Sequence, residues 1–238
     1  MLNKKAQIFL KKLFYNPRTA WHKANFNLFS DCKKILDLGC GKGLFIGLAP
    51  GKIIGLDTNW LSLKECKNEG YAVIKADALD LPFSDKSFDG IHCADLIEHF
   101  SPPDLRRLLI EIFRVLKVGG FLVIATPLSS KMFWDDASHL RPYPPKALLS
   151  YFIPDSSKGE ETQPTYESLP YRVKFVKLMW RHTQFYQLPL CLFFNHDRMR
   201  LGKLIRPSSL LFMFSNLAFR LKIRHPNPEG YIILLQKL

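Results

Sequence analysis

Three acidic residues recur every twenty positions in the first third of the chain, and glycines follow the first of them. Asp37, Asp57 and Asp77 each close a short apolar run, and residues 39–43 hold glycine at every second position. A loop without Cβ atoms can pass close to a ligand and adopt positive φ at little cost. This layout predicts a strand that leads into a loop holding a nucleoside cofactor.

The glycine spacing disfavours two phosphate-binding alternatives. A dinucleotide fingerprint requires its third glycine three residues after the second, and that position is Leu44. A P-loop requires Lys followed by Ser or Thr, whereas Lys42 precedes Gly43. The loop therefore fits a nucleoside better than a pyrophosphate.

The segment 36–43, Leu-Asp-Leu-Gly-Cys-Gly-Lys-Gly, closely resembles motif I of the class I S-adenosylmethionine-dependent methyltransferases, in particular those of type 11. Four further segments resemble later motifs of that family, in the family's order. They are residues 53–57, 73–78, 88–99 and 114–124. Five ordered motifs make the resemblance specific, where motif I alone would be weak.

The resemblance implies S-adenosyl-L-methionine as the cofactor and assigns roles to the acids. Asp57 would accept hydrogen bonds from the ribose hydroxyls, and Asp77 would bind the adenine amino group beside the backbone N–H of Ala78. The cofactor-binding residues expected from these motifs are Asp37, Gly39, Cys40, Gly41, Gly43, Asp57, Thr58, Asp77, Ala78 and Asp95.

The strands and helices that must position these residues are expected to repeat with the same twenty-residue spacing. Twenty residues accommodate one strand, one helix and two short loops, so the spacing of the acids predicts a parallel sheet with crossover helices. Ligands of such sheets bind outside the carboxyl ends of the strands, where all three acids fall. The resemblance implies a Rossmann-like α/β fold. Its seven-stranded sheet is mostly parallel with an antiparallel last strand, helices on both faces and a basic helical insertion before that strand.

Local signals place several of these elements. Residues 101–104, Ser-Pro-Pro-Asp, predict a helix start, and we expect Gly119–Gly120 to stop that helix. Residues 57–59, Asp-Thr-Asn, offer a cap for a helix that carries Leu61, Leu63 and Cys66, and the helix after the glycine loop is short, at 44–49. Residues 171–179 and 231–235 predict the sixth and last strands.

The chain divides by composition into three segments. Residues 1–32 form a basic amphipathic N-terminal extension, and 33–153 form the cofactor-binding core. Residues 154–238 complete the same domain with a mobile loop at 154–165, a basic apolar helical insertion at 181–220 and the final strand.

The net charge of +13 is carried by the two ends of the chain. Residues 1–36 have eight basic and one acidic side chain, 37–165 have fourteen and seventeen, and 166–238 have twelve and three. The basic ends are also rich in Phe and Leu, which suits peripheral contact with an anionic membrane or a lipid-like substrate. RNA binding is the less favoured alternative. A third is a terminal cap packed on the sheet with its charges outward.

Cysteine usage and hydropathy indicate the compartment. The five cysteines show no CxxC spacing, so they suggest neither a disulfide framework nor a zinc site. Lys11 and Lys12 interrupt the first apolar run, and no run reaches the roughly eighteen residues of a transmembrane helix. We therefore expect a cytoplasmic protein, peripheral to the membrane if the basic ends bind one.

Two histidines are candidate general bases. His99 follows the fourth expected strand, and His139 lies in a loop after the fifth. A base is needed only if the acceptor is protonated at neutral pH. The order Asp135-Asp136-x-x-His139 is not a diagnostic ligand set, so no metal is predicted. Arg141 and Tyr143 would bind an acidic acceptor or anchor the loop.

The sequence thus predicts a methyltransferase that acts on a small-molecule or lipid-linked acceptor. The alternatives are a tRNA methyltransferase and a non-catalytic binding protein that retains the fold.

Overall fold

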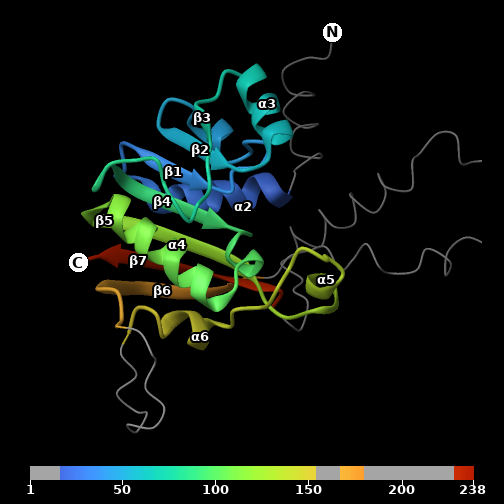
Figure 1. Ribbon diagram of the computed structural model, residues 1–238, viewed down its shortest axis with the longest axis vertical. Coiled ribbons are helices and arrows are strands. Elements are labelled where there is room, and N and C mark those ends of the chain that lie inside the picture. The colour runs from blue at the N-terminus through green and yellow to red at the C-terminus, as the bar shows by residue number, and fades with distance from the viewer. Residues whose placement is uncertain (1–16, 154–166, 180–227) are drawn as a thin grey trace, which may run out of the picture. The chain divides into compact units, whose positions relative to one another are not determined.

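A seven-stranded sheet organises the computed structural model, which describes residues 17–153, 167–179 and 228–238 (Figure 1). Residues His22–Met179 and Glu229–Leu238 form one compact unit that contains the whole sheet. The expected 154–165 loop, the 181–220 insertion and the extension before residue 17 lie outside the described residues.

The strand order is β3-β2-β1-β4-β5-β7-β6. The first five strands of this order are parallel, and β7 is antiparallel to both of its neighbours, as predicted for the last strand. The strands are β1 (Ile35–Leu38), β2 (Ile53–Asp57), β3 (Val73–Lys75), β4 (Phe88–Ala94), β5 (Leu116–Pro127), β6 (Tyr171–Met179) and β7 (Gly230–Lys237).

Helices cover both faces of this sheet. On one face, α4 buries Leu105, Leu108 and Ile112 in the same core as Leu36 and Leu38 of β1. Because side chains alternate along a strand, Ile35 and Asp37 point to the other face. The described helices are α2 (Pro17–Phe26), α3 (Trp60–Asn68), α4 (Pro102–Val115), α5 (Lys131–Trp134) and α6 (Pro145–Leu149), with short 3-10 turns η1 (Asn27–Phe29), η2 (Ile46–Leu48) and η3 (Ile97–His99).

The caps predicted for α3 and α4 are confirmed. The Asn59 side chain accepts hydrogen bonds from Leu61 N and Ser62 N, and Ser101 Oγ accepts one from Asp104 N. The end predicted for α4 is wrong. The helix stops at Val115, and Leu116 is already extended and paired with Phe88 of β4. Gly119, with φ +78°, therefore makes a bend within β5 and does not cap the helix.

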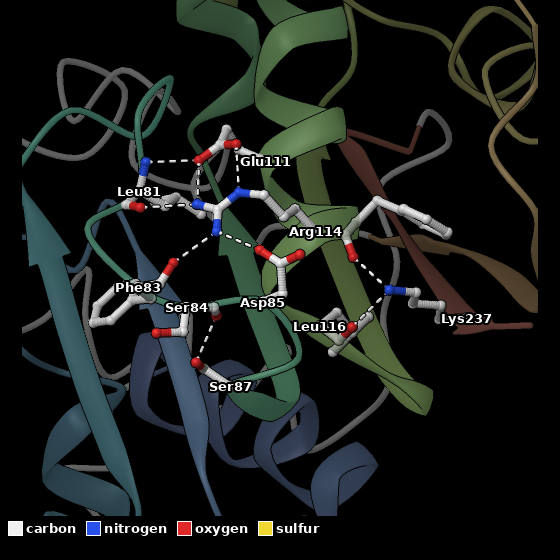
Figure 2. A network of polar contacts seen from close by, with 10 residues as sticks. Leu81, Phe83, Ser84, Asp85, Ser87, Glu111, Arg114, Leu116 and Lys237 are labelled. Atoms are coloured by element: carbon white, nitrogen blue, oxygen red, sulfur yellow. Dashed lines mark hydrogen bonds and ion pairs between the residues drawn. The ribbon is translucent and has the colours of Figure 1, made fainter.

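An arginine near the end of α4 ties that helix to the loop before β4 (Figure 2). The Arg114 guanidinium donates to Glu111 and Asp85 and to the carbonyl oxygens of Leu81 and Phe83, over 2.7–2.9 Å. Glu111 also accepts from Leu81 N at 2.8 Å. The planar guanidinium has five N–H donors and can bind all four partners at once. A lysine ammonium could not replace it in this arrangement.

Asp89 stabilises the same end of the sheet, where β4 begins. Its carboxylate accepts from Lys33 N and Lys34 N at 3.2 and 2.9 Å and from Lys117 Nζ at 2.7 Å. These bonds, chiefly that from Lys117, lower the pKa of Asp89 below its usual range. A lowered carboxyl pKa stabilises the fold above the unfolded pKa, and this contribution is lost as pH falls through the folded pKa.

We expect Asp89→Asn to lower the free energy of unfolding by about 1–2 kcal/mol at pH 7, because hydrogen bonds to a charged acceptor are weakened. Urea unfolding at a series of pH values measures the difference from the wild type, which should shrink below about pH 4. Asp80→Asn, a change at an exposed acid, is the control and should have little effect at any pH. A difference that does not vary with pH would argue against an ionic contribution.

Candidate functional site

The glycine loop leaves β1 at the carboxyl edge of the sheet and is held to the neighbouring strand. The backbone N–H groups of Gly39 and Cys40 both donate to the carbonyl oxygen of Leu56 in β2, at 2.9 and 3.1 Å. Gly39, Gly41 and Gly43 have φ of +67°, +50° and +75°, the left-handed region that glycine occupies without a Cβ penalty. The three glycines predicted to shape this loop therefore do so.

Asp57, the last residue of β2, braces the middle of this loop. Its Oδ2 accepts from Gly41 N at 2.9 Å, and its Oδ1 accepts from Asn59 N at 2.7 Å. A carboxylate has about four acceptor positions, so each oxygen keeps capacity for a further donor. Thr58 is the exposed residue between Asp57 and the cap of α3. The sequence prediction that Asp57 and the glycine loop share one site is consistent with this contact.

The remaining expected cofactor residues follow the ends of β3 and β4. Asp77 lies two residues beyond β3 and is exposed, with its Oδ1 accepting from Leu79 N at 2.9 Å, while Ala78 is buried. Asp95 lies directly after β4 with φ +50°, and its N–H donates to Ala125 O at 2.8 Å. A non-glycine residue in the left-handed region is uncommon, and such residues collect at functional sites. Because β3, β2, β1 and β4 are parallel neighbours, these residues share one edge of the sheet.

Two of the expected residues are buried behind the loop. The Cys40 side chain lies against β2, only 2.7 Å from where a Cβ on Gly55 would stand. Burial raises the pKa of the Cys40 thiol, so it is protonated at neutral pH. Cys40 therefore faces the site through its backbone.

Asp37 is the second of these buried residues, and it is paired with a histidine that the sequence analysis missed. Asp37 Oδ1 lies 2.7 Å from His92 Nδ1 on β4, and both side chains are almost fully buried. The His92 ring stacks on Phe45 with centroids 3.8 Å apart, and its Nε2 lies 3.3 Å from Asn25 Nδ2. Burial raises the pKa of Asp37, and the hydrogen bond from His92 opposes that effect. One signal was present in the sequence, a histidine between the apolar residues Ile91 and Cys93 of the strand 88–94.

The two candidate bases meet although forty residues separate them. His99 ends η3, His139 lies between α5 and α6, and their ring centroids are 4.9 Å apart. His99 Nδ1 lies 3.0 Å from Ser138 O, and His139 Nδ1 lies 2.8 Å from Phe133 O. Tyr143 is buried and donates to Phe100 O at 2.9 Å, while Arg141 stacks over its ring at 5.1 Å. Of the two roles expected for Tyr143, the structure shows loop anchoring.

The space above the glycine loop fits a nucleoside cofactor. Among the described residues other than Gly41 and its two chain neighbours, no heavy atom lies within 4 Å of the position where a Cβ on Gly41 would stand, so these residues leave the loop backbone open on that side. The Asp57 carboxylate and the loop's left-handed backbone flank this opening. The strand order and the position of this loop are those expected for a class I methyltransferase domain.

Comparison with known proteins gives matches to methyltransferases. Residues 36–124 match the family model described as a methyltransferase domain. A SAM-dependent methyltransferase from Archaeoglobus fulgidus superposes with a TM-score of 0.58 at 22% identity, covering 97% of this chain and 99% of that one. A possible histamine N-methyltransferase from Thermotoga maritima superposes with a TM-score of 0.59 at 17% identity, covering 98% and 96%. Both structures show the fold.

Sequence relatives have different acceptors in their names. The chain is 38% identical over 92 residues to tRNA (carboxymethyluridine(34)-5-O)-methyltransferase from Arabidopsis thaliana, covering 38% of this chain and 23% of that protein. It is 35% identical over 102 residues to phthiotriol/phenolphthiotriol dimycocerosates methyltransferase from Mycobacterium tuberculosis, covering 39% and 37%. The matches thus span less than two-fifths of either relative. In the part of the chain that the structure describes, every helix is too short or too polar to cross a membrane.

Proposed function

We propose that this protein transfers a methyl group from S-adenosyl-L-methionine to an acceptor. The observation that carries the proposal is the contact of Asp57 with Gly41, which joins the second-strand acid and the glycine loop at one edge of a methyltransferase-family domain. When bound, the cofactor supplies a methyl group on a sulfonium, which is a good leaving group.

Different residues at the carboxyl edge of the sheet would bind different parts of the cofactor. The backbone of residues 39–43 would lie along the methionine part, and the free acceptor positions of Asp57 would take the two ribose hydroxyls. Asp77 and the backbone at Ala78 would meet the adenine, since they follow the neighbouring strand β3. Asp95 follows β4, on the other side of β1 from β2, and is the last of the residues proposed to contact the cofactor.

Catalysis requires alignment of the acceptor more than side-chain chemistry. Holding the acceptor atom in line with the methyl carbon provides most of the acceleration through proximity and orientation. A hydroxyl acceptor must also lose its proton, and His99 and His139 are the side chains predicted for this step. In both rings Nδ1 faces a carbonyl oxygen, which only accepts, so Nδ1 carries a proton, and in the neutral imidazole the lone pair is on Nε2.

For the acceptor we propose a small-molecule or lipid-linked compound. The mycobacterial relative's name denotes a lipid substrate, and the basic segments of this chain, rich in Phe and Leu, suit contact with lipid-like molecules or an anionic membrane surface from the cytoplasmic side. A tRNA acceptor is the second candidate, and the similarity to the Arabidopsis enzyme favours it.

Transfer of a radiolabelled methyl group into cell extract tests the proposal directly. The purified full chain is incubated with labelled S-adenosylmethionine and extract, which is then separated into lipid, small-molecule, RNA and protein fractions. Label in the lipid or small-molecule fraction is the expected result, and label in RNA would establish the tRNA alternative. Cofactor binding by calorimetry with no label in any fraction would indicate a binding protein that retains the fold.

A further inference from the structure

Three side chains with metal-binding chemistry converge beside the proposed cofactor site. Glu98, His99 and His139 each place one ligand atom within 4.8 Å of the ligand atoms of the other two. Glu98 and His99 follow β4 in η3, whereas His139 comes from the loop after α5. The cluster therefore forms only when two separate segments pack together.

Both imidazoles are oriented in the way that metal-binding histidines usually are. The Nδ1–H of His99 donates to Ser138 O at 3.0 Å, and the Nδ1–H of His139 donates to Phe133 O at 2.8 Å. Such a bond to a backbone carbonyl fixes the tautomer and the ring orientation and makes Nε2 the ligand atom. The Asp136 Oδ2 atom lies 3.7 Å from His139 Nε2, which is too long for a hydrogen bond but within ion-pair distance when the ring is protonated.

The Glu98 side chain is also held in place by the fold. Glu98 is fully buried, and its Oε2 accepts from Thr126 Oγ1 on β5 at 3.0 Å. The Glu98 carbonyl oxygen also accepts from Leu140 N and Arg141 N at 2.9 and 3.4 Å. These bonds attach the loop that carries His139 to the segment that carries Glu98. The cluster is thus held together by backbone bonds that do not involve a metal.

We propose that Glu98, His99 and His139 bind one divalent transition-metal ion of the Zn²⁺, Co²⁺ or Mn²⁺ type. Two imidazoles and one carboxylate are a common set for these ions, whereas Ca²⁺ and Mg²⁺ prefer oxygen ligands throughout. Ligand bonds of about 2.0–2.2 Å place ligand atoms about 3.4 Å apart in tetrahedral geometry, so atoms that lie within 4.8 Å of one another need to approach by up to about 1.4 Å. Three protein ligands leave a coordination position for water or substrate.

This site replaces the earlier expectations of no metal and of a histidine base. A nitrogen lone pair that binds a metal ion cannot accept a proton, so His99 and His139 would act as ligands. The role that follows rests on the proposed methyl transfer. The ion acidifies a hydroxyl acceptor, which releases its proton to solvent and forms the new C–O bond, while the S–C bond breaks with its electron pair remaining on sulfur.

Metal titration tests the site without cofactor or acceptor. The full chain, free of affinity tag, is stripped with EDTA, exchanged into chelator-free buffer and titrated with Co²⁺ by visible absorption, then with Zn²⁺ by calorimetry. We expect one equivalent to bind, and Zn²⁺ to displace Co²⁺. Glu98→Gln and His139→Asn should each weaken binding at least 100-fold, because each removes one of three ligands.

Asp135→Asn is the matched control, since it changes an exposed acid of the loop that carries His139. It should bind Co²⁺ like the wild type, and Zn²⁺ should raise the thermal unfolding midpoint of both but not of Glu98→Gln. Equal affinity of Glu98→Gln and Asp135→Asn, or no stoichiometric binding by the wild type, would overturn the site. His139→Asn gives an independent answer if Glu98→Gln does not fold.

The two proposals fail in different ways. If the wild type binds no metal but labels an acceptor, the metal site is wrong and methyl transfer stands. If it binds one equivalent of metal and no fraction is labelled, the metal site stands and the methyltransferase proposal fails. If both hold, EDTA should abolish labelling and added Zn²⁺, Co²⁺ or Mn²⁺ should restore it.

Discussion

Asp57→Ala is expected to weaken binding of S-adenosylmethionine by at least about 100-fold. The substitution removes the proposed acceptor of two ribose hydroxyls, and each hydrogen bond to a charged group contributes about 1.5–3 kcal/mol. It also releases Gly41 N, which Asp57 Oδ2 holds at 2.9 Å, so the loop loses its brace. Isothermal titration calorimetry of the purified chain with the cofactor measures the change.

Asp89→Ala provides the matched control for this prediction. Asp89, like Asp57, is a strand carboxylate that accepts two backbone N–H bonds, but it lies where β4 begins, at the opposite edge of the sheet. Its loss should lower stability and leave cofactor affinity unchanged below the unfolding temperature. An Asp57→Ala protein that binds the cofactor as tightly as Asp89→Ala would remove Asp57 from the ribose site.

His92→Leu should lower the free energy of unfolding by about 3 kcal/mol or more, the largest stability effect that we predict. His92 is the partner of Asp37 at 2.7 Å in a buried position, and removing one member of such a pair leaves an uncompensated carboxylate. Leucine is apolar and replaces part of the imidazole's contact with Phe45, so the lost hydrogen bond dominates. Urea unfolding of both proteins at pH 7 measures the difference.

Asp37→Asn in the His92→Leu background separates the charge from the packing. Asparagine cannot ionise, whereas burial raises the pKa of Asp37. A raised folded pKa means that the folded state loses stability as pH rises above the unfolded carboxyl pKa of about 3.9. The double variant should therefore become increasingly more stable than His92→Leu as pH rises from about 4. A gap that stays constant with pH would show that the carboxylate charge is not the cause.

Local patterns predicted most of the fold and the cofactor edge. The strands and the caps at Asn59 and Ser101 follow the predictions because each depends on a short segment of sequence, whereas the antiparallel direction of the last strand was expected from the family resemblance. The end of α4 did not, since pairing of Leu116 with Phe88 ends the helix before Gly119 is reached. A contact with a distant strand decided that boundary.

The sequence by itself determined that successive strands have acidic residues at or near their ends and that a glycine loop follows the first of these strands. Glycine is favoured where the backbone takes positive φ, as it does at Gly39, Gly41 and Gly43, and parallel strands carry their terminal residues to one edge in any fold of this class. Those requirements are local and topological, so residue types and spacing suffice to reveal them.

Only the tertiary structure decided which side chains meet. Asp37 and His92 are paired across two strands, and Glu98 and His99 face His139 because a later loop docks on η3. The physical reason is that side-chain contacts between distant segments depend on packing and backbone hydrogen bonds that no local spacing records. The same reason made the two histidines look like separate candidate bases in the sequence, whereas in the fold they form one cluster with a buried carboxylate.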